Sequence, residues 1–330
     1  MRWERIGRHG RRPTVLQWVA AVAEAVPIAI IFGMVKLVPL DAASALGGFV
    51  FRQLGPRLKG LHSRVLRNIQ TGLPDLSEDR HREIAIGFWD NLGRTVFEYP
   101  HLQALRRKGR ITIVGHEVLR LSDAHSGPVL GFCGHFANWE LHAAVVDGMT
   151  RPLGLVYRPP NNPLINRALF RIRRRFGVHQ ISKGKKGGRS LVEALQAGTV
   201  VGMLVDQHLT NGLDLTFLGA PARTAPALAR LARNYNAMLA PVQLERVGGA
   251  NFRLTIHPLW SEDWTDDADA DVARVMARVN STLGDWVRAR PEQWLWLHDR
   301  FKTKSTPHSV ARLEPDVGHR LSSQTGGRVP

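Results

Sequence analysis

The sequence is organised around one apolar run and the polar block that follows it. The run is Val129-Leu130-Gly131-Phe132-Cys133, and Gly134-His135-Phe136-Ala137-Asn138-Trp139-Glu140 comes directly after it. An uninterrupted run of apolar and small residues is typical of a strand that is buried on both faces. Helical spacing then begins in residues 141–146, so His135 is predicted to lie at the carboxyl end of a strand.

Further apolar runs alternate with stretches of helical spacing on either side of this block. The strand-like runs are residues 111–114, 153–157, 200–205 and 239–244, and the helical stretches are residues 141–146, 164–176, 191–195, 226–235 and 272–286. Strands in alternation with helices predict an α/β fold with a mostly parallel central sheet flanked by helices. Ligands in such sheets bind at the carboxyl ends of the strands, which is where the sequence predicts His135.

The N-terminal part has a different composition. After the basic start at residues 1–12, residues 15–38 are apolar except for Glu24 and Lys36. A charge at mid-bilayer costs about 2.5–3.5 kcal/mol, so Glu24 favours an interfacial helix or one packed on protein. No cleavage site follows, which predicts an anchor that is kept. We therefore expect a membrane-anchoring segment (1–54), with a buried soluble helix as the alternative, then one domain (55–305) and a disordered tail (306–330) that is rich in Pro, Gly, Ser and Arg.

Charge and cysteine content narrow the classes of function. The 330 residues carry 45 Lys and Arg against 28 Asp and Glu, a net charge of +17, which suggests an anionic membrane surface, a phosphorylated substrate or nucleic acid as partner. No recognised nucleic-acid module is present, so we expect no nucleic-acid partner. The single cysteine, Cys133, excludes an intramolecular disulfide. Histidines and carboxylates do not cluster at ligand spacing, so neither a metal nor another cofactor is expected.

His135 and Glu140 are the first residues that suggest chemistry. Five helical steps leave two side chains about 140° apart, so the two can pair only if His135 precedes the regular helix and Glu140 reaches back from it. A carboxylate placed in this way would fix the imidazole tautomer, and the imidazole would act as a general base on a hydroxyl. A capping histidine and a solvated glutamate are the alternative, and the spacing leaves both open.

Ordered blocks along the chain resemble a known family. The blocks are residues 134–140, residues 157–165 from Tyr157-Arg158-Pro159-Pro160, residues 194–207 ending in Asp206-Gln207, and residues 291–303 with Trp294-Leu295-Trp296-Leu297-His298-Asp299-Arg300. Together they resemble the lipid A biosynthesis acyltransferases, whose hallmark is H-x-x-x-x-(D/E). The resemblance implies a glycerolipid-acyltransferase-like fold. It also implies an enzyme on the cytoplasmic face of the cell inner membrane that moves a fatty acyl chain from an acyl thioester, usually acyl carrier protein, to a hydroxyl of a lipid A precursor, a phosphorylated glycolipid.

The resemblance also assigns roles to individual residues. His135 becomes the general base and Glu140 its orienting partner. The substrate-binding residues implied are Arg158, Asp206, Gln207, Asn138 and Arg300. Arg158 would hold a phosphate or the oxyanion, and a salt bridge closing a loop is the alternative role. Asp206-Gln207 stands where some members carry Asp-His, which puts a second histidine in doubt and leaves His208 as a weak substitute.

Three functions remain open at this point. The first is acylation of a lipid A precursor, and the second is acylation of another polar lipid or glycolipid, such as a phosphatidylinositol mannoside. The third is a non-catalytic basic membrane-binding protein.

Two further groups of residues have a predicted structural role. Trp294 and Trp296, at alternate positions, are interpreted as one face of a buried strand. A run of arginines is interpreted as a basic patch that meets acyl carrier protein or lipid headgroups, namely Arg171, Arg173, Arg174 and Arg175.

Overall fold

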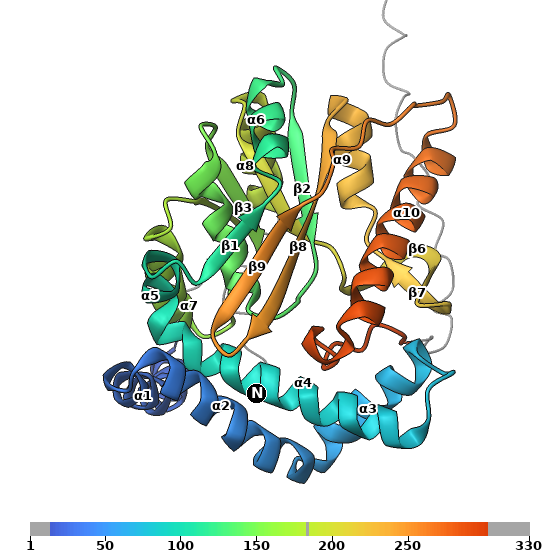
Figure 1. Ribbon diagram of the computed structural model, residues 1–330. Coiled ribbons are helices and arrows are strands. Elements are labelled where there is room, and N and C mark those ends of the chain that lie inside the picture. Colours follow the sequence, from blue (N-terminus) through green and yellow to red (C-terminus); the bar gives the residue numbers. More distant parts are fainter. Residues whose placement is uncertain (1–13, 183–184, 303–330) are drawn as a thin grey trace, which may run out of the picture.

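A seven-stranded sheet forms the centre of the computed structural model, which describes residues 14–182 and 185–302 (Figure 1). In spatial order the strands are β1 (Ile111–Val114), β9 (Asn251–Ile256), β8 (Met238–Gly248), β2 (Val129–Cys133), β5 (Val200–Leu204), β3 (Leu153–Tyr157) and β4 (His179–Ser182). Every neighbouring pair is parallel except β8 and β9, which form an antiparallel hairpin. The prediction of a mostly parallel sheet is confirmed.

Helices cover both faces of this sheet and enclose two hydrophobic cores. The larger core lies between the sheet and α4 (Glu78–Glu98), α8 (Lys185–Gln196), α9 (Ala227–Tyr235) and α10 (Ala268–Ala289). The second core lies under α5 (Leu102–Arg107), α6 (His116–Ala124) and the 3₁₀ helix η4 (Trp139–Gly148). A separate hairpin, β6 (His208–Phe217) with β7 (Ala220–Thr224), packs beside α10. The amphipathic pattern of residues 272–286 falls within α10, as expected.

Two local predictions were wrong. Residues 141–146 belong to the 3₁₀ helix η4 rather than to an α-helix. Trp294 and Trp296 are buried, as expected, but they do not form a strand: they follow a short 3₁₀ turn (Pro291–Gln293), and only Trp294 makes an isolated bridge, with Phe136. This bridge brings the end of the domain against the block that follows β2, so tertiary pairing decides the conformation of both segments.

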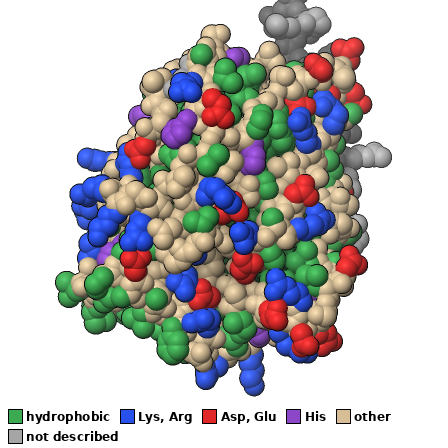
Figure 2. Space-filling model, viewed as in Figure 1, with side chains coloured by type: hydrophobic (Ala, Val, Ile, Leu, Met, Phe, Trp, Pro, Cys, Tyr) green, Lys and Arg blue, Asp and Glu red, His purple; other side chains and the backbone are tan. Residues whose placement is uncertain are grey.

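The N-terminal helices differ in how firmly they contact the domain. α2 (Leu40–Leu54) packs on α4 so closely that a Cβ at Gly47 would lie 2.4 Å from the carbonyl oxygen of Gly93. A 3₁₀ turn (Gly55–Arg57) leads from α2 into α3 (Lys59–Gly72). α1 (Val15–Leu37) instead contacts the domain along a narrow stripe, and the rest of its surface is exposed. Figure 2 shows hydrophobic side chains gathered at the lower left, where α1 lies.

α1 is long and apolar enough to cross a membrane by length and composition, although a buried helix or a signal sequence would meet the same criteria. Glu24 is exposed, but it accepts a 3.0 Å hydrogen bond from Asn162, so this face of α1 contacts the domain. The basic start at residues 1–12 and the predicted tail at 306–330 lie outside the described residues.

Candidate active site

His135 lies two residues beyond the end of β2, and Asp206 lies two residues beyond the end of β5. Because β2 and β5 are neighbouring parallel strands, their carboxyl ends meet at the same edge of the sheet. Gly134 permits the close approach, since a Cβ there would lie 2.7 Å from the Phe136 ring and 3.1 Å from Asp206 Oδ2. The terminal block holds the loop from the other side, where the backbone N–H of Leu295 donates to the carbonyl oxygen of His135.

The side chains of His135 and Asp206 form a buried pair. His135 Nδ1 lies 2.7 Å from Asp206 Oδ1, and the backbone N–H of His135 donates to Asp206 Oδ2 at 2.8 Å. The indole N–H of Trp294 donates to the same Oδ2 at 2.8 Å. Burial alone would raise the pKa of Asp206, but its electrostatic interaction and hydrogen bonds with His135, together with the hydrogen bond from Trp294, outweigh burial and hold the pKa well below its usual value. Asp206 is therefore a carboxylate at neutral pH.

The surrounding hydrogen bonds define the tautomer of His135. The side-chain amide of Gln207 lies 3.3 Å from His135 Nε2 and 2.8 Å from His298 Nε2. An amide N–H can only donate, so His135 Nε2 is an acceptor and its proton is on Nδ1, where it is donated to Asp206. The lone pair on Nε2 therefore faces Gln207 and the adjoining pocket. This arrangement is suited to removing a proton from a hydroxyl.

Glu140 does not orient His135, and this prediction was wrong. Its carboxylate accepts two hydrogen bonds from Arg173, at 2.7 and 2.6 Å, and one from the Tyr99 hydroxyl at 3.1 Å. The reason is local: Ala137 has a left-handed φ of 48° and its N–H is bonded to the carbonyl oxygen of Gln293, so the chain turns before η4 begins. Glu140 then faces α7 (Pro163–Arg174) and is neutralised there by Arg173.

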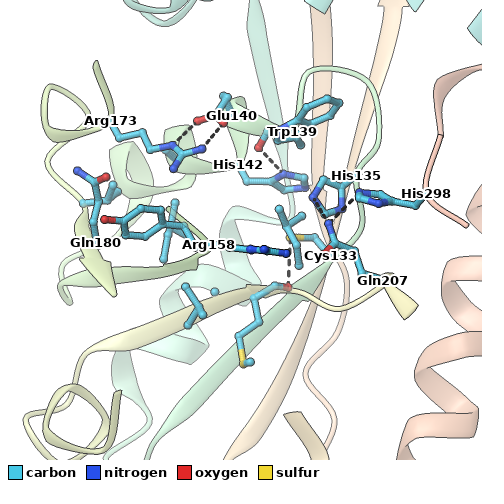
Figure 3. Close-up of a pocket in the computed structure, with 18 residues that line it drawn as sticks. Cys133, His135, Trp139, Glu140, His142, Arg158, Arg173, Gln180, Gln207 and His298 are labelled. Carbon is cyan, nitrogen blue, oxygen red and sulfur yellow. Dashed lines mark hydrogen bonds and ion pairs between the residues drawn. The ribbon is translucent and has the colours of Figure 1, made fainter. Parts of the chain in front are cut away.

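His135 and the Glu140–Arg173 ion pair line one cavity of about 280 Å³ (Figure 3), and Asp206 is reached from it through His135. Four predicted site residues, His135, Glu140, Arg158 and Gln207, line this cavity. Four residues that were not predicted to face a pocket also line it, namely Trp139, His142, Arg173 and His298. Part of the wall is apolar. A smaller apolar cavity of about 50 Å³ shares four lining residues with it: Cys133, His142, Leu155 and Gly202. The pocket therefore combines a titratable group with a route toward apolar space.

Arg158 is the most accessible charged group of this pocket. It follows the end of β3 and is exposed. Within residues 14–182 and 185–302 no hydrogen bond or ion pair holds its guanidinium. The salt bridge considered from sequence is therefore not formed among the described residues, and the cation is available to an anionic group in the pocket.

Asn138 and Arg300 do not reach the pocket, which corrects their predicted substrate contacts. Asn138 is fully buried and donates to Glu98 at 2.9 Å. Arg300 is also fully buried, and its guanidinium donates to the carbonyl oxygen of Arg223 at 2.6 Å and to the Thr224 hydroxyl at 2.8 Å. Both side chains serve the packing of the domain. The motif letters alone gave no sign of this burial.

Two pocket histidines were missed as site residues. His298 belongs to the terminal block, and its ring packs edge-on against that of His135 with 5.3 Å between centroids. The sequence signal that could have indicated this role was its place in the terminal block, two residues after Trp296. Burial lowers the pKa of His142 to about 4, so this histidine is neutral at physiological pH. Burial also raises the pKa of the Cys133 thiol far above its usual value, which excludes this residue as a nucleophile near neutral pH.

The predicted basic patch divides in two. Arg173 turns inward to Glu140, with its side chain 19% exposed, whereas Arg171, Arg174 and Arg175 are exposed together with Arg167. Across the part of the chain that the structure describes, no group of three or more His, Cys, Asp or Glu side chains is arranged to hold a metal ion.

The fold and the pocket define an α/β protein with a histidine–carboxylate pair at the ends of two parallel strands. The family model of bacterial lipid A biosynthesis acyltransferases matches residues 19–303, and the chain belongs to this family. It is therefore an O-acyltransferase.

Similar proteins agree with this assignment. The lipid A biosynthesis lauroyltransferase of Escherichia coli is 28% identical over 78% of this chain and 83% of its own. The palmitoleoyltransferase of the same organism is 28% identical over 82% and 88%, and the myristoyltransferase is 23% identical over 74% and 76%. A solved 1-acyl-sn-glycerophosphate acyltransferase from Thermotoga maritima aligns with 70% of this chain and 97% of its own, at 11% identity and a TM-score of 0.34.

Proposed function

We propose that this acyltransferase moves a fatty acyl chain from an acyl thioester to a hydroxyl of a lipid A precursor, with His135 as the general base and Asp206 as its orienting partner. The observation that carries the proposal is the 2.7 Å contact between His135 Nδ1 and Asp206 Oδ1, which leaves Nε2 as an acceptor beside the pocket. The acceptor lipid is inferred from the names of the three relatives, which are all lipid A biosynthesis transferases.

The proposed reaction has two steps. His135 Nε2 takes the proton of the acceptor hydroxyl while the hydroxyl oxygen bonds to the thioester carbonyl carbon, which gives a tetrahedral oxyanion. The intermediate then collapses, the carbon–sulfur bond breaks, and the imidazolium returns its proton to the leaving thiolate. Asp206 stabilises the imidazolium between the two steps, and general base catalysis of this kind contributes about 10²–10⁴-fold.

In this scheme Arg158 binds a negatively charged group of the substrate or the oxyanion of the intermediate. It lines the pocket with its guanidinium unpaired among the described residues, and a guanidinium presents a planar fork of donors to a phosphate or an oxyanion. The Gln207 amide donates to His135 Nε2, and the acceptor hydroxyl would take its place there. These two residues are proposed to bind substrate.

The acyl chain is assigned to the apolar side of the pocket. The small cavity beyond Cys133 and Leu155 is lined almost entirely by apolar side chains, and Gly131 lies on its wall. Hydrocarbon binds where apolar surface leaves water. A chain entering from the pocket would place its thioester end near His135.

The proposed acyl donor and cellular location are inferred from exposed residues. Arg167, Arg171, Arg174 and Arg175 are exposed on and beside α7, the helix whose Arg173 lines the pocket. This cluster supports an acidic acyl carrier protein as donor. α1 contacts α7, and the exposed apolar face of α1 supports attachment to the anionic cytoplasmic face of the cell inner membrane.

Two experiments test the proposal. His135→Ala, purified and shown to be folded by its thermal transition, should lose transfer from acyl carrier protein to a lipid A precursor; retained turnover would refute the mechanism. Mass spectrometry of lipid A from a deletion strain tests the acceptor. Loss of one secondary acyl chain is expected, whereas an unchanged profile would favour another polar lipid.

A further inference from the structure

α1 contacts the domain at two places, and both lead to the same wall of the pocket. The first contact is made by Asn162, which caps the N-terminus of α7: its Oδ1 accepts from the backbone N–H groups of Leu164 and Ile165. Its amide N–H₂ donates in the opposite direction, to the carbonyl oxygen of Ala21 and to Glu24 Oε2, both at 3.0 Å. One buried side chain therefore joins α1 to the start of α7.

The second contact is made by the segment Tyr99–His101. The ring of Phe32 stacks on that of Tyr99 with 6.3 Å between centroids, Lys36 donates to the carbonyl oxygen of Pro100 at 2.7 Å, and the His101 ring is bonded to the carbonyl oxygen of Val35 at 3.0 Å. The Tyr99 hydroxyl reaches onward to Glu140 at 3.1 Å. Burial raises the pKa of Tyr99 well above its usual value, so the hydroxyl stays a donor.

The two routes converge on one ion pair. The first route leads to Arg173, which α7 carries, and the second leads to Glu140, which Tyr99 contacts. Arg173 and Glu140 bind each other at 2.6 Å, and both line the pocket. The Arg173 guanidinium also lies over the Tyr157 ring, 5.4 Å from its centroid, directly before Arg158. The position of α1 thus constrains both Glu140 and Arg173, which line the pocket.

We propose that α1 positions the reaction site as well as attaching the protein to a lipid surface, and that Asn162, Phe32 and Tyr99 are the positioning residues that connect it to the Glu140–Arg173 wall. The proposal rests on the acyl transfer proposed above. None of the three residues needs to touch the reacting atoms. Their effect is transmitted through the helix and the ion pair that they hold.

A reversal of hydrogen-bond donor and acceptor tests the first route. Asn162→Asp keeps the acceptor that caps α7, and a carboxylate is favourable at a helix N-terminus, so α7 should remain folded. The variant cannot donate to α1, however, and it sets two carboxylates against each other. We expect kcat to fall about 10-fold, less than the roughly 10²-fold that a 1 Å misplacement of a reacting group can cost, with little change in KM.

Glu24→Gln still accepts from Asn162 and should stay close to wild type. The double variant Asn162→Asp/Glu24→Gln restores one donor–acceptor pair with the roles exchanged, and it should recover most of the lost kcat. Failure of the double variant to recover any activity, with an unchanged thermal transition, would overturn the role of Asn162. Ile30→Ala on the exposed face of α1 is the matched control: it should weaken binding to anionic phospholipid vesicles and leave kcat in detergent micelles unchanged.

Phe32→Ala and Tyr99→Phe test the second route independently. Each should lower kcat, and because they break one chain of contacts their combined effect should be no larger than the stronger single effect. Fully additive losses, or losses seen only in thermal stability, would overturn the second route. His135→Ala separates this inference from the proposed function. If that variant is inactive while all the α1 variants keep wild-type kcat, only the positioning role is refuted.

Discussion

Asp206 and Glu140 are two buried carboxylates, each bonded to a side chain that lines the same pocket, and these partners give them different chemistry. Asp206 holds an imidazole, a group that can accept and return a proton, and the second ring nitrogen is presented toward the pocket. Glu140 holds a guanidinium, which remains charged at any physiological pH. The first pair can move a proton, whereas the second can only fix a wall and an electrostatic field. The residue that a carboxylate faces, rather than its place in a motif, decides its role.

Asp206→Asn should produce the largest difference between the two pairs. Without the carboxylate, His135 loses the group that holds its tautomer and stabilises the imidazolium, so kcat should fall about 10²–10⁴-fold. Steady-state kinetics with a carrier-bound acyl donor measures the loss. Adding His135→Ala to this variant should cost little more, because the two residues act as a unit. A variant within a few-fold of wild type would contradict the role of Asp206.

Arg158→Ala should come next, with a loss of about 10²-fold in kcat/KM, since one charge-assisted donor to the substrate is removed. The thermal transition should not move, because no described residue is bonded to this guanidinium. Arg158→Lys keeps the charge without the planar fork and should recover part of the loss. A change in thermal stability alone would return Arg158 to the role of closing a loop.

Glu140→Gln should show the reverse balance between stability and activity. It leaves Arg173 largely buried without its counter-ion, so the free energy of unfolding should fall by about 3 kcal/mol. Turnover per folded molecule should fall no more than about 10-fold, because the change displaces a wall and removes no proton acceptor. Denaturant titration and kinetics on the same preparation give both numbers. Loss of turnover to the level of Asp206→Asn would remove the distinction between the two carboxylates.

His142 predicts a pH dependence of stability. Burial lowers its pKa from 6.5 to about 4 in the folded protein. Above pH 6.5 neither the folded nor the unfolded state holds the proton, but as the pH falls toward 4 only the unfolded state binds it, so stability is lost. At pH 5 this difference amounts to about 2 kcal/mol. His142→Asn should remove this part of the slope between pH 7 and pH 5, and an unchanged slope would contradict the neutral, buried state.

Gly131→Ala should have the smallest effect. The added methyl group meets no atom closer than 3.7 Å, so the sheet accepts it, and Gly131 lines the small apolar cavity. The methyl group occupies the space of about one methylene, which is about 0.8 kcal/mol or 4-fold in kcat/KM against the longest acyl chain used. Competition between donors of different chain length measures the shift. An unchanged preference would place the acyl chain elsewhere.

The sequence predicted the sheet and the position of His135 because both depend on local pattern. All five strands expected from apolar runs are present, and His135 follows β2 as expected. The partner of His135 depends on which strands are neighbours. Asp206 lies 71 residues away, and only the pairing of β2 with β5 brings it to the histidine, whereas Glu140 is near in sequence and turns away. A motif written along the chain therefore favoured the wrong carboxylate.

The remaining differences have the same origin. Asn138 and Arg300 belong to the motifs, but their side chains are hydrogen-bonded inside the domain. Asn138 donates to Glu98, and Arg300 donates to two residues of β7. His298, in contrast, reaches the pocket because the terminal block folds back on the loop after β2. Burial and long-range contacts decide which polar residues of a block face the substrate. The spacing of residues along the chain does not report either of them.

The protonation state of His135 provides the most direct test of this account. NMR of histidine-labelled protein, with the resonance assigned by its absence in His135→Ala, reports the Nδ1 proton. We predict a strongly downfield Nδ1–H in the wild type that persists in Glu140→Gln and is lost or displaced in Asp206→Asn. The opposite pattern, a signal that survives Asp206→Asn and disappears in Glu140→Gln, would contradict the assignment of Asp206 as the orienting carboxylate.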